Sequence, residues 1–265
     1  MKHVYVVGLL ALLGGSCSEK KSAEGKQAAR PTPASESAAS AVPPDSISRE
    51  RVSLAQVPAA LRLPGKLLEA WRWQDANGEN LLVVFRNGPF PEKQTKYTDE
   101  ESYVELLARQ YVRRAGSWQE LWRLQDAVRN CPFDLWLGPL PGSTSVTDLD
   151  GNGQSETTLL YKLTCRSDVS PSDLKLILHE GQAKYALRGQ MVVQYDSVPL
   201  LQRAPANPCC VDTLSKTVLE APEGYELLAG RYQNEKDFRR APPALLRFAR
   251  QQWRKWSVRD EFEQL

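Results

Sequence analysis

Histidine is nearly absent from this chain of 265 residues, which contains only His3 and His179. A metal centre built from several imidazoles is therefore excluded, and a catalytic triad would have to use His179 if the N-terminal segment is removed. His179 precedes Glu180 where a hairpin turn is expected, so we predict a solvated turn histidine and no catalytic base. Two carboxylates suffice for glycosidase chemistry, but no motif among the 32 acidic residues nominates a pair.

The chain also lacks an excess of either charge. It has 34 Lys and Arg against 32 Asp and Glu, with a formal net charge of +2. Binding of nucleic acid needs cations gathered on one face, and this balance gives no such footprint, so we expect no nucleic-acid partner. Hydrophobic residues make up 42% and charged residues 25% of the chain, which is ordinary globular composition.

Long hydrophobic runs are missing as well. The apolar run at residues 4–13 is about half of the ~20 residues that a spanning helix needs. It follows a charged start and precedes small residues and Cys17, which is the layout of a secretory signal. Small residues before an early cysteine resemble the bacterial lipobox, so we predict a signal peptide at residues 1–16 and a lipid anchor on Cys17.

One detail departs from the lipobox pattern, because Leu13 stands four positions before Cys17 and not three. Secretion without a lipid is the alternative. Ser18 follows the cysteine where an acidic residue would typify retention in the inner membrane of some bacteria. We therefore expect the protein to be exported and held in the outer membrane, on its periplasmic side or at the cell surface.

A segment poor in large apolar residues follows Cys17. Seventeen of the 29 residues at 18–46 are Ala, Ser or Pro. Such a segment buries too little apolar surface to offset its ordering entropy. We predict that residues 17–48 form a tether and that residues 49–265 form a single β-rich globular domain.

The domain is expected to be mainly β, an antiparallel meander of hairpins with one C-terminal amphipathic helix. Asn77-Gly78 and the turn at Ala115-Gly116 lie between apolar segments that alternate as strands do. A third hairpin turns at Glu180-Gly181. The predicted strands lie at 67–73, 81–85, 104–113, 118–124, 145–147, 157–163, 174–179, 184–188 and 191–195.

The helix is predicted at residues 242–258, where two prolines can open it. Apolar residues recur at helical spacing and should form its buried face: Leu245, Phe248, Ala249, Trp253 and Trp256. The other face carries Arg247, Arg250 and Arg254. Solvent is the favoured neighbour of this face, and anionic lipid or sugar acids are the alternative.

An acidic loop at residues 148–156 is the sharpest motif. Oxygen-bearing side chains occupy loop positions one, three, five and nine, with glycine at position six, and this pattern suits calcium. The predicted ligands are the side chains of Asp148, Asp150, Asn152 and Glu156, with the carbonyl of Gln154 at position seven. The loop is not an EF-hand, because position twelve is Leu159 and the flanks are predicted to be strands. A metal-free turn is the alternative, since Asp, Asn and Gly favour tight turns.

Four cysteines remain if Cys17 is lipidated, and an exported chain can keep disulfides. We favour a bond between Cys131 and Cys165, which would clamp the unit holding the acidic loop. A bond between Cys209 and Cys210 is the least plausible, because neighbouring α carbons lie ~3.8 Å apart across a trans peptide. Free buried thiols are the alternative.

Seven tryptophans are many for this length. Trp71 with Trp73, and Trp118 with Trp122, have the spacing of residues on one face of a strand. Such stripes can bind sugars, but they more often belong to the core. We predict core.

From Trp71 onward the chain resembles, at the level of pattern, a family of uncharacterised exported proteins of Bacteroidota that are labelled surface polysaccharide biosynthesis proteins. The resemblance covers most of residues 67–258 and implies a process, with no catalytic residues. It rests on Trp73-Gln74-Asp75, Gly78-Glu79-Asn80, Asp126-Ala127-Val128, Asn130-Cys131-Pro132-Phe133-Asp134, Val146-Thr147-Asp148-Leu149-Asp150, residues 161–171 and residues 184–189.

Together these features predict a non-enzymatic lipoprotein of the cell envelope. Its calcium-stabilised β domain would contribute to the biosynthesis or retention of surface polysaccharide, with a surface glycan or envelope proteins as partners. Two alternatives remain open. A carbohydrate-active hydrolase would need a cleft with two close carboxylates and exposed tryptophans, and an interaction module would show a flat apolar patch.

Overall fold

The computed structural model describes residues 47–92, 101–168, 170–193, 199 and 204–260. All of them belong to one compact unit, Val42–Leu265. The predicted signal peptide, Cys17 and the tether as far as residue 46 lie outside the described residues. Within the described part of the chain, no helix has both the length and the apolar character needed to cross a membrane.

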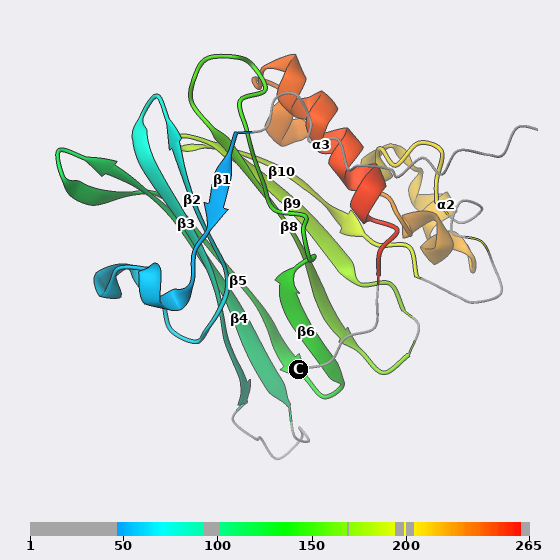
Figure 1. Ribbon diagram of the computed structural model, residues 1–265. Coiled ribbons are helices and arrows are strands. Elements are labelled where there is room, and N and C mark those ends of the chain that lie inside the picture. The colour runs from blue at the N-terminus through cyan, green and yellow to red at the C-terminus, as the bar shows by residue number, and fades with distance from the viewer. Residues whose placement is uncertain (1–46, 93–100, 169, 194–198, 200–203, 261–265) are drawn as a thin grey trace, which may run out of the picture. The chain divides into compact units, whose positions relative to one another are not determined.

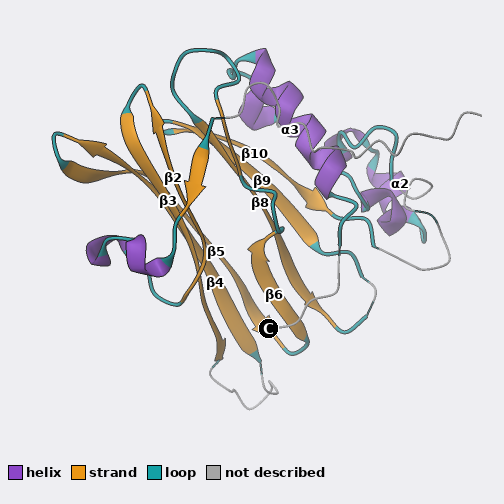
Figure 2. Cartoon of the chain, in the orientation of Figure 1, coloured by secondary structure: helices purple, strands orange, loops and turns teal. Residues whose placement is uncertain are grey.

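Two antiparallel sheets pack face to face (Figures 1 and 2). The first is a five-stranded meander in the order β1-β2-β3-β4-β5, and the second has the order β10-β9-β8-β6, with β7 also paired to β8. The predicted class is confirmed. The strands are β1 (Arg49–Arg51), β2 (Lys66–Asp75), β3 (Gly78–Pro91), β4 (Ser102–Arg114), β5 (Ser117–Cys131), β6 (Asp134–Pro139), β7 (Ser145–Thr147), β8 (Glu156–Arg166), β9 (Asp173–Glu180) and β10 (Ala183–Gln190).

The three predicted hairpins form where their turn residues lie, between β2 and β3, β4 and β5, and β9 and β10. Gly78 shows why the first turn needs glycine. Its φ is +120°, and a Cβ there would lie 2.8 Å from the backbone oxygen of Arg113 on β4. Any other residue would combine a disfavoured backbone conformation with a clash.

The strand predicted at 191–195 is wrong in its described part. Met191 and Val192 are buried, but their backbone NH groups donate to the oxygens of Ser172 and Ser257 in neighbouring connections. Val193 lies in an isolated bridge to Asp260, outside any strand. The apolar run is buried because loops cover it, and Tyr195 lies outside the described residues.

Three hydrophobic clusters form in layers. The inner faces of both sheets meet in the first, where Trp73, Leu106 and Trp122 pack with Leu137, Leu159 and other residues of the second sheet. The second lies between the outer face of β8–β10 and the C-terminal helix. The third lies under the N-terminal segment, where Val52 and Val57 cover the outer face of the first sheet near the short 3-10 helices η1 (Leu54–Gln56) and η2 (Ala59–Leu61).

The C-terminal helix α3 (Pro243–Trp256) confirms the predicted element and its buried face. All five predicted apolar residues are buried, and the Trp253 indole NH donates to the backbone oxygen of Gly230 at 2.9 Å. The remaining helices are short: α2 (Lys216–Leu219) and the 3-10 turns η3 (Val211–Thr213), η4 (Gly224–Leu228) and η5 (Lys236–Phe238).

The tryptophan pairs behave differently. Trp73 is buried in the inner core and Trp71 packs against it. Trp118 and Trp122 do not share a face, because the pairing of β4 with β5 shifts register between Gln110 and Tyr111. Trp122 therefore enters the inner core, whereas Trp118 packs on the outer cluster. A β-bulge, which spacing alone does not reveal, causes the difference.

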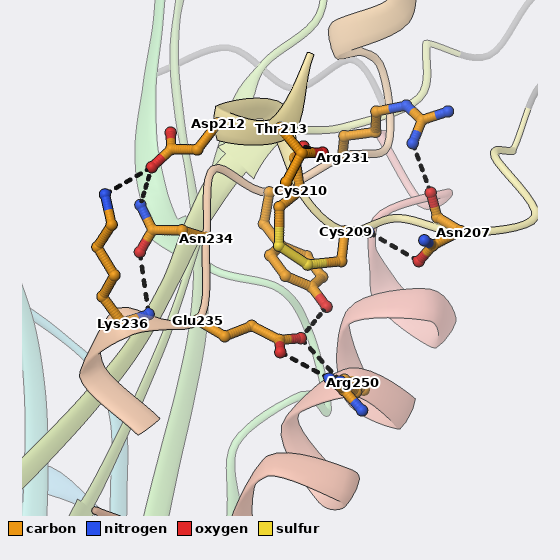
Figure 3. The surroundings of a disulfide bond; sticks show 11 residues. Asn207, Cys209, Cys210, Asp212, Thr213, Arg231, Asn234, Glu235, Lys236 and Arg250 are labelled. Atoms are coloured by element: carbon orange, nitrogen blue, oxygen red, sulfur yellow. Dashed lines mark hydrogen bonds and ion pairs between the residues drawn. A yellow bond between two sulfur atoms is a disulfide. The ribbon is translucent and has the colours of Figure 1, made fainter. Parts of the chain in front are cut away.

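The structure forms two disulfides. Cys131 at the end of β5 is bonded to Cys165 in β8 with α carbons 5.7 Å apart, so the predicted bond joins the two sheets. The bond between Cys209 and Cys210, predicted to be the least plausible, is also present (Figure 3). That prediction assumed a trans peptide, whereas the peptide here is cis and the α carbons lie 3.1 Å apart.

Candidate metal site

The hairpin of β7 and β8 brings the ends of the acidic loop together. Thr147 pairs with Glu156, so Asp148 leaves one strand beside the residue that begins the other. The strands flanking the loop are as predicted. Gly151 and Gly153 have φ values of +73° and +82°, which glycine adopts without strain and which fold the loop back on itself.

Three of the predicted ligands meet at this loop. Asp148, Asp150 and Glu156 each offer a carboxylate oxygen, and these oxygens lie within 4.8 Å of one another. Oxygens bound to one Ca²⁺ at about 2.3–2.6 Å can be up to ~5 Å apart, so the spacing suits a single cation. The cluster can therefore bind a metal ion.

The carboxylate of Asp148 is only partly used by the loop. Its Oδ2 accepts a hydrogen bond from the NH of Gly153 at 3.1 Å, while its Oδ1 is buried and has no hydrogen-bond partner among the described residues. A buried acceptor without a partner loses its hydration with no compensation. Asp150 is exposed, and its Oδ1 accepts from the NH of Asn152.

Glu156 is fully buried, and its Oε2 accepts from the hydroxyl of Thr147 and the NH of Leu149, both at 2.9 Å. Burial, together with the nearby charges of Asp150 and Glu180, raises its pKa to about 7 despite these hydrogen bonds. Glu180 is its direct partner across β8 and β9. Two acidic residues opposite each other in a sheet repel, and a cation between their charges would relieve that repulsion.

The other two predicted ligands face different groups. The side-chain oxygen of Asn152 accepts from the NH of Gln154 at 2.7 Å, and its Nδ2 donates to Asp150 and to Glu180. The side-chain oxygen of Gln154 accepts from Asn77 on the β2–β3 turn. The side-chain oxygen of Asn152, a predicted ligand atom, thus already serves a hydrogen bond within the protein, whereas the ligand atom predicted for Gln154 is its carbonyl and not this side-chain oxygen.

The first sheet supports this loop, which the sequence did not indicate. Asp75, at the end of β2, accepts from the NH and the hydroxyl of Ser155 at 3.0 and 2.6 Å. The same hydroxyl accepts from the indole NH of Trp73, and the NH of Ala76 donates to the oxygen of Gly153. The β2–β3 turn therefore fixes the C-terminal half of the acidic loop.

The structure places His179 differently from the sequence prediction. His179 is not solvated, because it is only 3% exposed and its ring stacks on Trp122 with centroids 4.1 Å apart. Burial lowers its pKa to about 3, with Lys184 adding to the effect, so the ring is neutral. Its side chain points between the sheets, where the strand alternation places it on the same face as Ile177.

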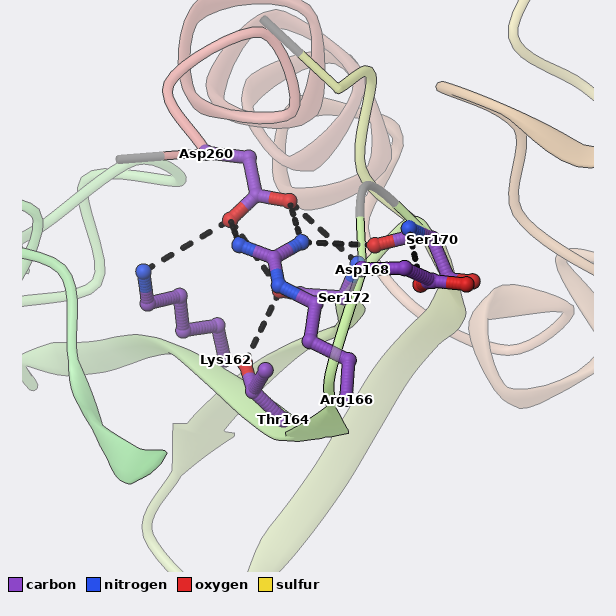
Figure 4. Close-up of polar contacts among 7 residues, drawn as sticks. All are labelled: Lys162, Thr164, Arg166, Asp168, Ser170, Ser172 and Asp260. Carbon is purple, nitrogen blue, oxygen red and sulfur yellow. Dashed lines mark hydrogen bonds and ion pairs between the residues drawn. The ribbon is translucent and has the colours of Figure 1, made fainter. Parts of the chain in front are cut away.

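A buried ionic cluster forms on the outer face of β8, which α3 covers, near the end of the strand that is remote from the acidic loop (Figure 4). Asp260 is fully buried and accepts from both terminal nitrogens of Arg166 at 2.8 and 3.2 Å and from the hydroxyl of Ser172 at 3.0 Å. The Nζ of Lys162 lies 3.6 Å from Oδ1 of Asp260. The arrangement fastens Asp260, which follows α3, to the sheet, with one buried carboxylate shared by two buried cations.

None of the seven tryptophans, all of which are described, is largely exposed. Trp71, Trp118 and Trp136 are partly exposed and the other four are buried, so the described surface carries no stripe of exposed tryptophans. Comparison with known protein families, curated proteins and solved structures finds no significant match to this chain.

Proposed function

We propose that this protein is a lipid-anchored envelope protein whose β domain is stabilised by calcium and contributes, without catalysis, to the biosynthesis or retention of surface polysaccharide. The observation that carries the calcium assignment is the cluster of three carboxylates, one of them buried opposite Glu180. A hard cation with oxygen ligands is the group that such a cluster suits. The N-terminal pattern ending at Cys17 supports the anchor, and the resemblance to exported Bacteroidota proteins supports the process.

Thermal melting of the purified full chain tests the calcium assignment. Calcium should raise the melting temperature, and the double substitution Asp148→Ala, Asp150→Ala should abolish that rise. Asp148→Asn with Asp150→Asn keeps oxygens for the loop hydrogen bonds while removing the charge, so it should also abolish the rise. Identical melts of the wild type with calcium and with a chelator would contradict the assignment.

Deletion of the gene tests the process and the anchor. Surface polysaccharide from the deleted strain should be reduced or altered in gel profile and sugar composition. Wild-type protein should restore it, and Cys17→Ala should not, because the domain would no longer be held at the membrane. An unchanged polysaccharide profile would count against the role in surface polysaccharide, and full rescue by Cys17→Ala would count against the anchor.

A further inference from the structure

Cations gather in the segment that contains the C-terminal helix, with no acidic residue between the first and the last of them. Residues 239–259 contain seven Lys or Arg and no Asp or Glu, in a protein whose net charge is only +2. Six of the seven side chains are exposed, and we call these six the basic strip: Arg239, Arg240, Arg247, Arg254, Lys255 and Arg259.

The basic strip is not neutralised by the rest of the described protein. Arg250, the seventh cation, forms an ion pair with Glu235 at 2.6 Å. None of the six strip residues has a carboxylate partner among the described residues, and Lys255 and Arg259 lie instead against the ring of Trp256. Unpaired cations close together repel one another, and a bound anionic ligand would reduce that electrostatic repulsion.

The shape of the strip follows from α3. Arg247 and Arg254 are two turns apart on one helix face, and the 14-residue helix is ~21 Å long. The opposite face is buried against the second sheet, and no large apolar side chain of α3 is exposed. A helix that lies in a membrane surface inserts an exposed apolar face, which α3 does not have. The strip therefore favours a soluble anionic chain over a lipid surface.

A hollow adjoins the strip near the start of α3. Its volume is about 410 Å³, and its lining includes Arg239 of the strip with apolar surface from Cys210, Phe238 and Leu246. Its polar lining includes Glu235 and Asp212, and Asp212 accepts hydrogen bonds from Asn234 and Lys236 (Figure 3). Apolar lining with a few polar groups is typical of sites for small organic molecules, and the volume suits one sugar unit.

We propose that the basic strip and this hollow bind an acidic glycan, a polymer whose sugars carry carboxylate or phosphate groups. Successive anionic groups would lie along Arg247 and Arg254, and a sugar near the helix start would occupy the hollow beside Arg239. This inference rests on the proposed function and specifies its ligand as an anionic polysaccharide. Arginine forks suit both anionic groups because they donate two parallel hydrogen bonds.

The test measures binding of the purified full chain to immobilised polygalacturonate, with dextran as the neutral polymer, at 50 mM and 300 mM NaCl. Polygalacturonate should bind and dextran should not, and the higher salt should weaken binding because it screens exposed charges. Arg247→Gln with Arg254→Gln should weaken binding about tenfold, and Arg239→Gln should weaken it several-fold. The matched control, Arg114→Gln with Arg123→Gln, removes the same charge from exposed positions of β4 and β5 and should change affinity less than about twofold.

Three results would overturn the inference: no binding to polygalacturonate at 50 mM NaCl, equal loss in both double variants, or stronger competition by soluble dihexanoyl phosphatidylglycerol than by galacturonate oligomers. The last would assign the strip to lipid headgroups. Gene deletion separates the two proposals. An unchanged surface polysaccharide with intact polygalacturonate binding would remove the proposed process and leave the ligand assignment standing.

Discussion

At the level of single residues, Glu156 links the candidate metal site to pH. Its pKa in the folded protein is about 7, above the ~4.3 of a free glutamate. Its contribution to stability without metal is therefore fully present below about pH 4 and is lost as the pH rises through 7. Calcium binds the ionised carboxylate, so the calcium-dependent rise in melting temperature should grow between pH 5 and pH 8.

Melting curves at pH 5, 6, 7 and 8, with and without calcium, measure this growth. Glu156→Gln removes the titrating group, keeps an oxygen toward Thr147 and Leu149, and should flatten the dependence of the calcium-free protein on pH. A calcium effect of the same size at every pH would contradict the role of Glu156 as a ligand.

His179 is predicted to make stability depend on pH with the opposite sign to Glu156. Its pKa of about 3 lies below the ~6.5 of a free histidine, so stability is lost as the pH falls from 6.5 toward 3. His179→Phe keeps a ring for stacking on Trp122 and cannot be protonated. Between pH 7 and pH 4.5 its free energy of unfolding should therefore decrease about 2 kcal/mol less than that of the wild type. Urea unfolding at the two pH values gives this difference, and equal decreases would show that the ring is protonated as readily in the folded protein as in the unfolded chain, so that burial does not lower its pKa.

At the level of elements, the two disulfides should contribute unequally. Cys131 and Cys165 are 34 residues apart and join β5 to β8, and closing a loop of that length is worth about 4 kcal/mol in the chain-entropy model. Cys131→Ser with Cys165→Ser should lower the free energy of unfolding by an amount of that order. Cys209→Ser with Cys210→Ser is the matched control, because a bond between adjacent residues closes no long loop. Equal losses in denaturant unfolding would argue against the entropic account.

Elements that depend on residues close together in the sequence could be predicted from it, whereas features that depend on contacts between distant segments could not. Asn77-Gly78 and the helical spacing of α3 act within a few residues, and both predictions are confirmed. Glu180 was missed at the candidate site because its place opposite Glu156 depends on the register of β8 and β9. His179 was predicted to be solvated for a similar reason, since Trp122, which covers it, belongs to the other sheet.

For the whole molecule, β8 is the strand through which the sheets are held together. Before its first residue, Ser155 is bound by Asp75 of the first sheet, and near its last residue Cys165 is bonded to Cys131. The candidate metal site lies at the Ser155 end. Metal binding there is therefore expected to depend on a sheet that supplies none of the three clustered carboxylates.

Asp75→Ala tests this dependence. The substitution removes both hydrogen bonds to Ser155 and should lower the free energy of unfolding by about 1–3 kcal/mol. It should also weaken calcium binding several-fold. Without these hydrogen bonds the acidic loop becomes ordered only when calcium binds, and that ordering reduces the net free energy of binding. Asp134→Ala, at an exposed position of β6, should change neither quantity. Calorimetric calcium titration alongside urea unfolding measures both effects. A loss of stability with unchanged calcium affinity would show that the loop is held in place by its own turns, independently of the first sheet.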